Sequence, residues 1–231
     1  MIMKTIAYNL QAVRERIALA CAAAGRPVES VQLLAVSKTK PNALVIEAYV
    51  AEQRAFGENY VQEGVEKVNS LRIVCPQAEW HFIGPLQSNK TRLVAESFDW
   101  VHGIERVKIA QRLSEQRPAG AAPLNLCIQV NVSGEASKSG VAPRELAALA
   151  HAVNALPNVR LRGLMAIPEP LVGLAAQRVP FVQLRELFSE LCAAGLALDT
   201  LSMGMTSDLE AAIAEGATVV RVGTAIFGER Q

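Results

Sequence analysis

Aromatic residues and charged residues are both sparse in this 231-residue chain. Aromatics make up 5% and charged residues 19%, and the 23 lysines and arginines exceed the 22 aspartates and glutamates by only one. A net charge so close to zero argues against a nucleic-acid-binding surface, which needs a clustered positive excess. Hydrophobic residues reach 51%, which is too many for a disordered chain. The composition therefore indicates a folded globular protein.

Long hydrophobic runs are also missing. No stretch approaches the roughly 18 uninterrupted apolar residues that a membrane helix needs. The first ten residues contain no apolar run that could serve as a signal peptide. We therefore expect a soluble, cytoplasmic protein that does not enter a membrane.

The chain has few cysteines and histidines, and neither set has the spacing of a metal site. No two cysteines have C-x-x-C spacing, and no histidine lies at a zinc-ligand interval from a cysteine. Free cysteines usually behave as small buried hydrophobic residues, and we expect that here. The residues concerned are Cys21, Cys75, Cys127, Cys192, His81, His102 and His151.

Strand-like and helix-like runs alternate along the whole chain. A first helix is predicted over residues 6–20, where apolar residues repeat every three or four positions, and Gly25 ends it. Short apolar runs follow at residues 31–36, 54–56, 80–83, 100–101, 124–132, 161–166, 198–201 and 218–222. Helical patterns separate them at residues 43–52, 60–71, 90–96, 106–115, 143–155, 182–194 and 208–214. Such runs indicate parallel strands that helices cover on both faces.

The spacing of these units predicts an α/β fold, a single (β/α)8 barrel of the TIM type over residues 1–231. Eight units average about 29 residues each, close to the size expected for such a barrel. Only nine residues follow the last predicted strand, too few for a full helix, so we expect the extra N-terminal helix to fill that gap in the outer ring. An open doubly wound sheet is the alternative, and the even spacing favours the barrel.

A lysine continues the apolar face of the first predicted strand. Alternation places Leu34, Val36 and Lys38 on one face, and Pro41 ends the run. In a barrel this strand end belongs to the face that carries chemistry. An ammonium group there is costly unless it finds a partner or loses its charge, and either route favours an amine that can form a Schiff base. A lysine that extends to solvent at the barrel rim is the alternative.

Other strand ends carry polar or small residues. Asn59 follows the second strand, and its spacing to Gln62 predicts a helix cap. Gly84 ends the third strand, where a glycine either lets a ligand approach the backbone or makes a plain turn. A loop of small residues at 133–140 follows the fifth strand.

The ends of the seventh and eighth strands predict a phosphate site. Small, donor-rich segments lie there, Ser202, Met203, Gly204 and Met205 in one and Arg221, Gly223 and Thr224 in the other. The spacing of Ser207 and Glu210 predicts a capping box that starts a helix. The loops after strands 7 and 8 of barrels often bind phosphate. A reactive lysine facing such a site suggests a phosphorylated carbonyl compound, either a sugar phosphate, as in Schiff-base aldolases, or pyridoxal phosphate.

Six segments together make the chain resemble the pyridoxal-phosphate homeostasis proteins, a family related to the N-terminal barrel of alanine racemase. They are AVSKTKP at 35–41, FGENY at 56–60, WHFIGPLQSNK at 80–90, GLM at 163–165, LSMGM at 201–205 and RVGT at 221–224. The resemblance implies that Lys38 carries pyridoxal 5'-phosphate as an internal aldimine. It also implies that Arg221 faces the pyridine nitrogen and that Asn59 lies near the ring. The expected phosphate ligands are Ser202, Gly204, Gly223 and Thr224, and Gly84, Met203 and Met205 complete the expected cofactor site.

The resemblance further implies a cofactor carrier that buffers or delivers pyridoxal phosphate, with no catalytic residue. An arginine at the ring nitrogen can only donate a hydrogen bond, which weakens the electron sink that amino-acid chemistry uses. Racemase relatives add a second domain with a catalytic tyrosine, and we expect none after Gln231. Pyridoxal-phosphate-dependent apoenzymes are candidate recipients, and we expect a monomer.

A racemase-like enzyme and a Schiff-base aldolase remain alternatives. Racemisation needs a second acid–base group across the cofactor from Lys38. The nearest candidates are His81 and Lys138. We expect His81 to be buried in the third strand, and Lys138 to lie in a loop that cannot hold a fixed geometry.

Overall fold

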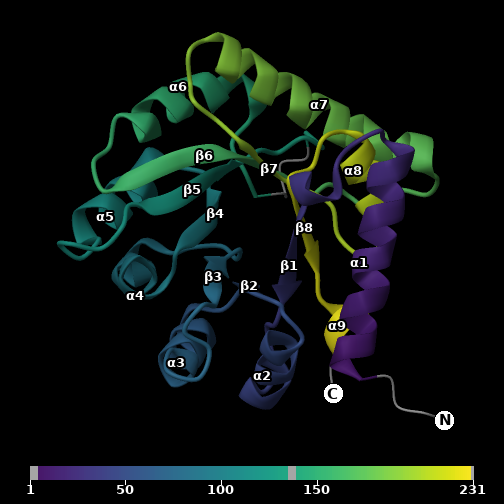
Figure 1. Ribbon diagram of the computed structural model, residues 1–231. Coiled ribbons are helices and arrows are strands. Elements are labelled where there is room, and N and C mark those ends of the chain that lie inside the picture. The colour runs from purple at the N-terminus through teal and green to yellow at the C-terminus, as the bar shows by residue number, and fades with distance from the viewer. Residues whose placement is uncertain (1–4, 135–138, 230–231) are drawn as a thin grey trace.

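In the computed structural model, which describes residues 5–134 and 139–229, eight parallel strands close into a barrel (Figure 1). Each strand pairs with its neighbours in chain order, and the last pairs with the first. The strands are β1 (Gln32–Val36), β2 (Ala55–Glu58), β3 (Glu79–Phe82), β4 (Trp100–Ile104), β5 (Leu124–Gln129), β6 (Val159–Met165), β7 (Thr200–Ser202) and β8 (Val219–Val222). The predicted barrel is confirmed, and the open sheet is excluded.

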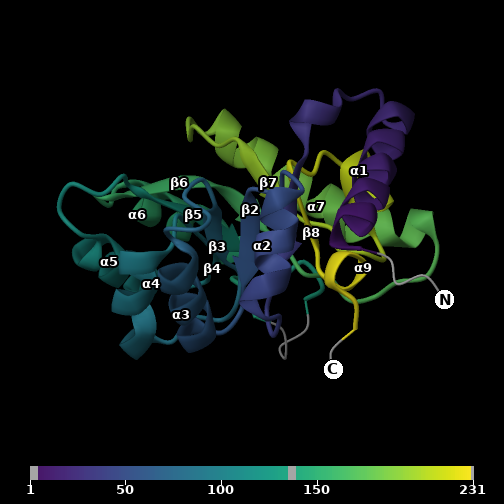
Figure 2. The ribbon, with the colours of Figure 1, turned by 60° about the horizontal axis from the view of Figure 1, so that its bottom comes forward.

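Helices form an outer ring around these strands (Figures 1 and 2). They are α1 (Ile6–Ala23), α2 (Asn42–Val50), α3 (Val61–Leu71), α4 (Thr91–Ser97), α5 (Val107–Gln116), α6 (Pro143–Asn154), α7 (Leu174–Ala193), α8 (Leu209–Ala214) and α9 (Thr224–Phe227). No helix within the described ranges combines the length and the apolar character needed to cross a bilayer.

Helix α1 completes the ring where α9 is too short to do so. It packs against α2, α8 and α9, and Figure 2 shows it beside α9. Its apolar stripe, Ile6, Leu10, Val13, Ile17 and Ala20, is buried. Gly25 follows the helix with a φ of 64°, a left-handed conformation that suits glycine at a helix end. The predicted role of the N-terminal helix is therefore confirmed.

Several elements, among them β2, β4 and α7, run longer than their patterns predict. Strand β2 continues to Glu58 because that carboxylate is buried against polar partners, and β4 continues through His102 to Ile104. Helix α7 begins eight residues before the predicted start at 182 and continues through Pro180. Proline lacks the N–H of a helical hydrogen bond, so the pattern gives little sign of a helix across that position.

The cysteines are free, as expected. Cys21, Cys75 and Cys127 are buried and Cys192 is half-buried. Burial raises the pKa of the Cys127 thiol to about 12, so this thiol is inert at neutral pH.

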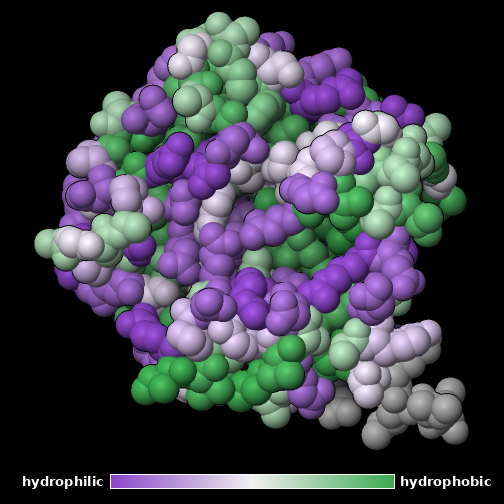
Figure 3. Space-filling view, viewed as in Figure 1, coloured by the Kyte–Doolittle hydropathy of each residue, from purple (hydrophilic) through white to green (hydrophobic). Residues whose placement is uncertain are grey.

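On the face seen in Figure 3, hydrophilic side chains gather around a hollow over the centre of the barrel.

Candidate functional site

A cavity of about 200 Å³ lies at the carboxyl ends of the strands, the end at which barrel enzymes carry their chemistry. Its lining residues come from the ends of six strands and are Val36, Lys38, Asn59, Ile83, Ile167, Met205, Thr206, Arg221, Gly223 and Thr224. Six of the ten predicted site residues are among them: Lys38, Asn59, Met205, Arg221, Gly223 and Thr224. The structure thus brings Lys38 and the end of β8 to one cavity.

The other four predicted residues, Gly84, Ser202, Met203 and Gly204, do not line this cavity. A Cβ at Gly84 would lie 2.1 Å from the carbonyl oxygen of Asn59, so glycine there lets two backbone segments pass each other. Gly204 has a φ of 93°, and a Cβ there would lie 2.5 Å from Cβ of Ala212 in α8. Met203 is fully buried in the core, and Ser202 lies beneath Arg221.

The backbone on both sides of Lys38 is tied to α3. Lys67 Nζ donates to the carbonyl oxygen of Ser37 at 2.7 Å, and the N–H of Thr39 donates to Glu63 Oε1 at 2.5 Å. Thr39 has a φ of 62°, in the left-handed region that β-branched residues rarely adopt. These two bonds therefore hold the strained turn that presents Lys38 to the cavity.

A buried carboxylate anchors this turn. Glu58 Oε1 accepts hydrogen bonds from Lys67 Nζ at 2.7 Å and from Ser37 Oγ at 2.6 Å, and all three side chains are almost completely buried. Burial raises the pKa of Glu58, and the attraction of Lys67 offsets only part of that effect. The position of Lys38 thus depends on an ion pair that has lost its hydration.

Asn59 does not cap α3, contrary to its predicted role. The cap residue of that helix is Tyr60, and its side chain makes no capping hydrogen bond to the helix. Asn59 instead lines the cavity, where its Oδ1 is buried and has no hydrogen-bond partner within the described residues. An unpaired buried amide oxygen is costly, so a polar ligand group at this wall would be favourable.

The predicted capping box of Ser207 and Glu210 is also wrong. Helix α8 begins at Leu209, its cap residue is Asp208, and the side chain of Asp208 makes no capping hydrogen bond to the helix. Asp208 Oδ1 accepts from the N–H of Met205 at 2.5 Å, and Glu210 forms an ion pair with Arg16 at 2.8 Å. These alternative partners explain why the box does not form.

Another part of the cavity wall suits an anion. Gly223 and Thr224 lie at the beginning of α9 and line the cavity. The first N–H groups of a helix have no partner within the helix, and they carry a partial positive charge. Met205 and Thr206 bring a second segment with backbone N–H groups and a hydroxyl to the same cavity.

Arg221 lies at the base of the cavity and is almost fully buried. Its Nη1 donates to the carbonyl oxygen and to Oγ of Ser202 at 2.6 and 2.8 Å, and its Nη2 donates to the carbonyl oxygen of Ala166 at 2.8 Å. Burial lowers the pKa of Arg221 to about 10, so the guanidinium is still charged at neutral pH.

Sequence reasoning missed the residues that support the site from behind. Glu58, Glu63 and Lys67 belong to β2 and α3. In the sequence, such charged residues are typical of an exposed surface. One signal was available, since Glu58 directly follows an apolar run that ends at a predicted site. The apolar lining residues Val36, Ile83 and Ile167 were likewise not predicted.

Comparison with known proteins decides the family. The family model "Alanine racemase, N-terminal domain" matches residues 8–231. The pyridoxal phosphate homeostasis protein of Pseudomonas aeruginosa is 63% identical to this chain over 228 residues, which cover 99% of the chain and 97% of that protein. The chain belongs to the pyridoxal phosphate homeostasis protein family. The resemblance stated from the sequence motifs is therefore confirmed.

A second pyridoxal phosphate homeostasis protein and one solved structure extend the comparison. The Escherichia coli protein of that name is 55% identical over 229 residues, covering 99% of this chain and 98% of its own length. The structure of PipY from Synechococcus elongatus, described with pyridoxal phosphate bound, has a TM-score of 0.85 and 40% identity. That match covers 97% of this chain and 100% of PipY.

Proposed function

We propose that this protein holds pyridoxal 5'-phosphate in the cavity through a Schiff base with Lys38, and that it stores or hands on the cofactor without turning over amino acids. One arrangement supports this most directly: Lys38 shares a single cavity with Arg221 and with the start of α9 at Gly223 and Thr224. The names of the family members and the bound cofactor of PipY favour the same ligand.

The residues present fit this cofactor at three points. The start of α9 offers backbone N–H groups to the phosphate. The unpaired Oδ1 of Asn59 marks a wall that needs a polar partner, and the substituted ring can supply one. Arg221 donates three hydrogen bonds to Ser202 and Ala166, and a guanidinium has five N–H groups. The remaining donors can serve the ring nitrogen.

The covalent step needs no further reactant. Lys38 would hold the cofactor through a carbon–nitrogen double bond from its Nζ, and the aldehyde oxygen would be lost as water. Bound pyridoxal phosphate supplies an electron-withdrawing ring. Arg221 would donate a hydrogen bond to the ring nitrogen and keep it unprotonated, which would weaken the withdrawal of electrons.

The phosphate is expected to provide much of the affinity. We expect pyridoxal without its phosphate to bind about 100-fold more weakly, because it lacks two charge-assisted hydrogen bonds. Thr224→Val, which keeps the side-chain shape, should weaken binding of the phosphate form about tenfold and leave pyridoxal binding unchanged. Equilibrium dialysis measures both. Equal affinity for the two compounds would refute the phosphate site.

Thr224 is a cleaner position for this test than Gly223. A Cβ at Gly223 would lie 3.2 Å from the carbonyl oxygen of Val36, at the end of the strand that leads to Lys38. A larger side chain there would disturb the lysine as well as the phosphate site.

The described residues that line the cavity do not include the second acid–base group that racemisation requires. Among its described lining residues, Lys38 and Arg221 are the ionisable side chains. His81 is fully buried, as predicted, and its ring nitrogens contact His102 and Glu79 away from the cavity. Lys138 lies outside the described residues.

We therefore expect no physiologically useful exchange of the α-proton of amino acids. Loaded protein is incubated with single-enantiomer amino acids in heavy water, and deuterium incorporation and optical purity are followed by NMR and chiral chromatography. Free pyridoxal phosphate at the same concentration is the control. Fast exchange with loss of optical purity would replace the carrier by a racemase-like enzyme.

A further inference from the structure

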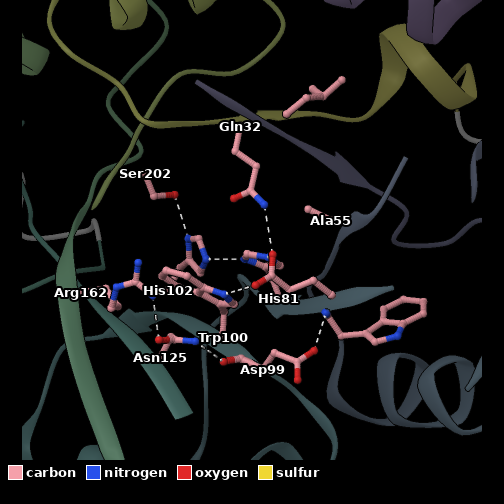
Figure 4. A network of polar contacts seen from close by, with 12 residues as sticks. Gln32, Ala55, His81, Asp99, Trp100, His102, Asn125, Arg162 and Ser202 are labelled. Atoms are coloured by element: carbon pink, nitrogen blue, oxygen red, sulfur yellow. Dashed lines mark hydrogen bonds and ion pairs between the residues drawn. The ribbon is translucent and has the colours of Figure 1, made fainter. Parts of the chain in front are cut away.

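A chain of polar side chains crosses the inside of the barrel from Arg221 in β8 to Glu79 at the start of β3. Ser202 Oγ lies 2.8 Å from Arg221 Nη1 and 2.8 Å from His102 Nδ1. His102 Nε2 lies 2.9 Å from His81 Nδ1, and His81 Nε2 lies 3.2 Å from Glu79 Oε2. Figure 4 shows the two imidazole rings between Ser202 and the far end of the chain. Four different strands thus contribute to one connected series of hydrogen bonds.

One end of this chain, at Glu79, is exposed on the protein surface, and the other, at Arg221, reaches the cavity. Ser202, His102 and His81 are 0% exposed, and the side chain of Glu79 is 37% exposed. Barrels of this kind are usually filled by bulky apolar side chains. Buried polar groups lower stability unless every member is satisfied, so an apolar filling would serve a purely structural role better. The end at Arg221 touches the cavity, which points to a role there.

Glu79 fixes the far end. Its carboxylate accepts from Trp100 Nε1 at 2.7 Å and from Gln32 Nε2 at 3.0 Å, besides the contact with His81. Burial raises the pKa of Glu79, but the hydrogen bonds from His81, Trp100 and Gln32 outweigh that effect and lower the pKa to about 2. The ring of His81 also stacks on Trp100, with centroids 5.3 Å apart and an interplanar angle of 8°.

The two ends determine the direction of every hydrogen bond between them. A guanidinium can only donate, so Ser202 Oγ accepts from Arg221 and its hydroxyl hydrogen goes to His102 Nδ1. Burial, together with the positive charge of Arg221, lowers the pKa of His102 well below its usual value, so the ring is neutral. Because Nδ1 accepts from Ser202, the ring proton lies on Nε2. His102 then donates to His81 Nδ1, and His81 donates from Nε2 to the Glu79 carboxylate.

We propose that Ser202, His102, His81 and Glu79 are positioning residues that hold the Arg221 guanidinium toward the ring nitrogen of the bound cofactor. This inference rests on the proposed function of the cavity. Because His102 takes the hydroxyl hydrogen of Ser202, the lone pairs of Ser202 Oγ face Arg221 and fix one rotation of the guanidinium. Glu79, although it does not line the cavity, biases the whole series through its charge.

The first test uses the protein without cofactor. Histidine side chains labelled with ¹⁵N report the protonated nitrogen of each ring by NMR. We expect the proton of His102 on Nε2 and that of His81 on Nε2, so that each ring donates along the series toward Glu79. A proton on Nδ1 of either ring would overturn the proposed direction of the chain.

The second test compares pyridoxal phosphate with the analogue in which a CH group replaces the ring nitrogen. Wild-type protein is expected to prefer the natural cofactor, and His102→Phe should reduce that preference about tenfold, the effect of one hydrogen bond to a charged group. Glu79→Gln keeps the shape of the far end and removes its charge, so it should reduce the preference by a smaller factor.

Gln53→Leu is the matched control. Gln53 is buried, and its Nε2 donates to the carbonyl oxygens of Leu33 and Ala55, outside the chain. This variant should lose stability without a change in preference. An unchanged preference in both His102→Phe and Glu79→Gln would overturn the inference. Failure of the wild-type protein to bind pyridoxal phosphate would instead refute the proposed function, and the tautomers would still be measurable.

Discussion

Lys38→Ala is expected to abolish covalent attachment of pyridoxal phosphate. The side chain of Lys38 lies at the cavity, and its amine is the group that forms the Schiff base in the proposed function. Wild-type protein loaded with the cofactor and reduced with borohydride should carry a stable adduct on the peptide that contains residue 38. In the variant, mass spectrometry should find no adduct, and the visible absorbance band of the Schiff base should be missing.

Lys40→Ala provides the matched control. Lys40 is the nearest other lysine in the chain, but its Nζ donates to the carbonyl oxygen of Glu229 at 2.6 Å and it does not line the cavity. The Lys40 variant should retain the full adduct on Lys38. A full adduct on another lysine in the Lys38 variant would refute the assignment.

Lys67→Met is expected to lower the free energy of unfolding by about 3–5 kcal/mol, because it leaves the buried Glu58 carboxylate without its partner. It also removes the bond to the carbonyl oxygen of Ser37, which holds the turn before Lys38. We therefore expect slower or weaker cofactor attachment even where the variant is folded. Urea unfolding measures the first effect, and the borohydride adduct measures the second.

The loss of stability in Lys67→Met should depend on pH. Glu58 already has a raised pKa because of burial, and Lys67 is the main group that lowers it. Without Lys67 the folded-state pKa rises further above the ordinary value of 4.5, so the folded protein binds a proton at Glu58 more tightly than the unfolded chain does. The loss of unfolding free energy should shrink as the pH falls toward 4.5, and it should grow as the pH rises through the pKa of Glu58 in the folded variant.

A second substitution tests the cause of this deficit. Glu58→Gln in the Lys67→Met background removes the unpaired charge and keeps an acceptor for Ser37 Oγ. The double variant should be more stable than Lys67→Met at neutral pH and should lose most of the pH dependence. A double variant no more stable than the single one would show that the buried charge is not the reason.

The barrel could be predicted from the sequence because both faces of each parallel strand are buried, which leaves a short apolar run for every strand. The first helix was predictable for the same reason, since its apolar stripe from Ile6 to Ala20 faces the core. Helix α7 was predicted only in part, because Pro180 interrupts the local pattern while packing keeps the helix intact.

The cavity residues that end strands were predictable, because strand ends of a barrel converge on one face. Lys38 and Arg221 are separated by 183 positions along the chain (221 − 38), yet both line one cavity. The supporting contacts were not predictable. Nothing in the linear pattern shows that Lys67 reaches back to Ser37, or that His81 and His102 lie 2.9 Å apart, because such contacts depend on how neighbouring strands and helices pack.

The most direct test of the proposed function is a peptide map of the wild-type protein after loading with pyridoxal phosphate and reduction with borohydride. We predict one cofactor per chain, located on Lys38, with the visible Schiff-base band lost on reduction. A cofactor that remains bound without a reducible linkage, or that maps to a different lysine, would contradict the proposal that this cavity holds pyridoxal phosphate through Lys38.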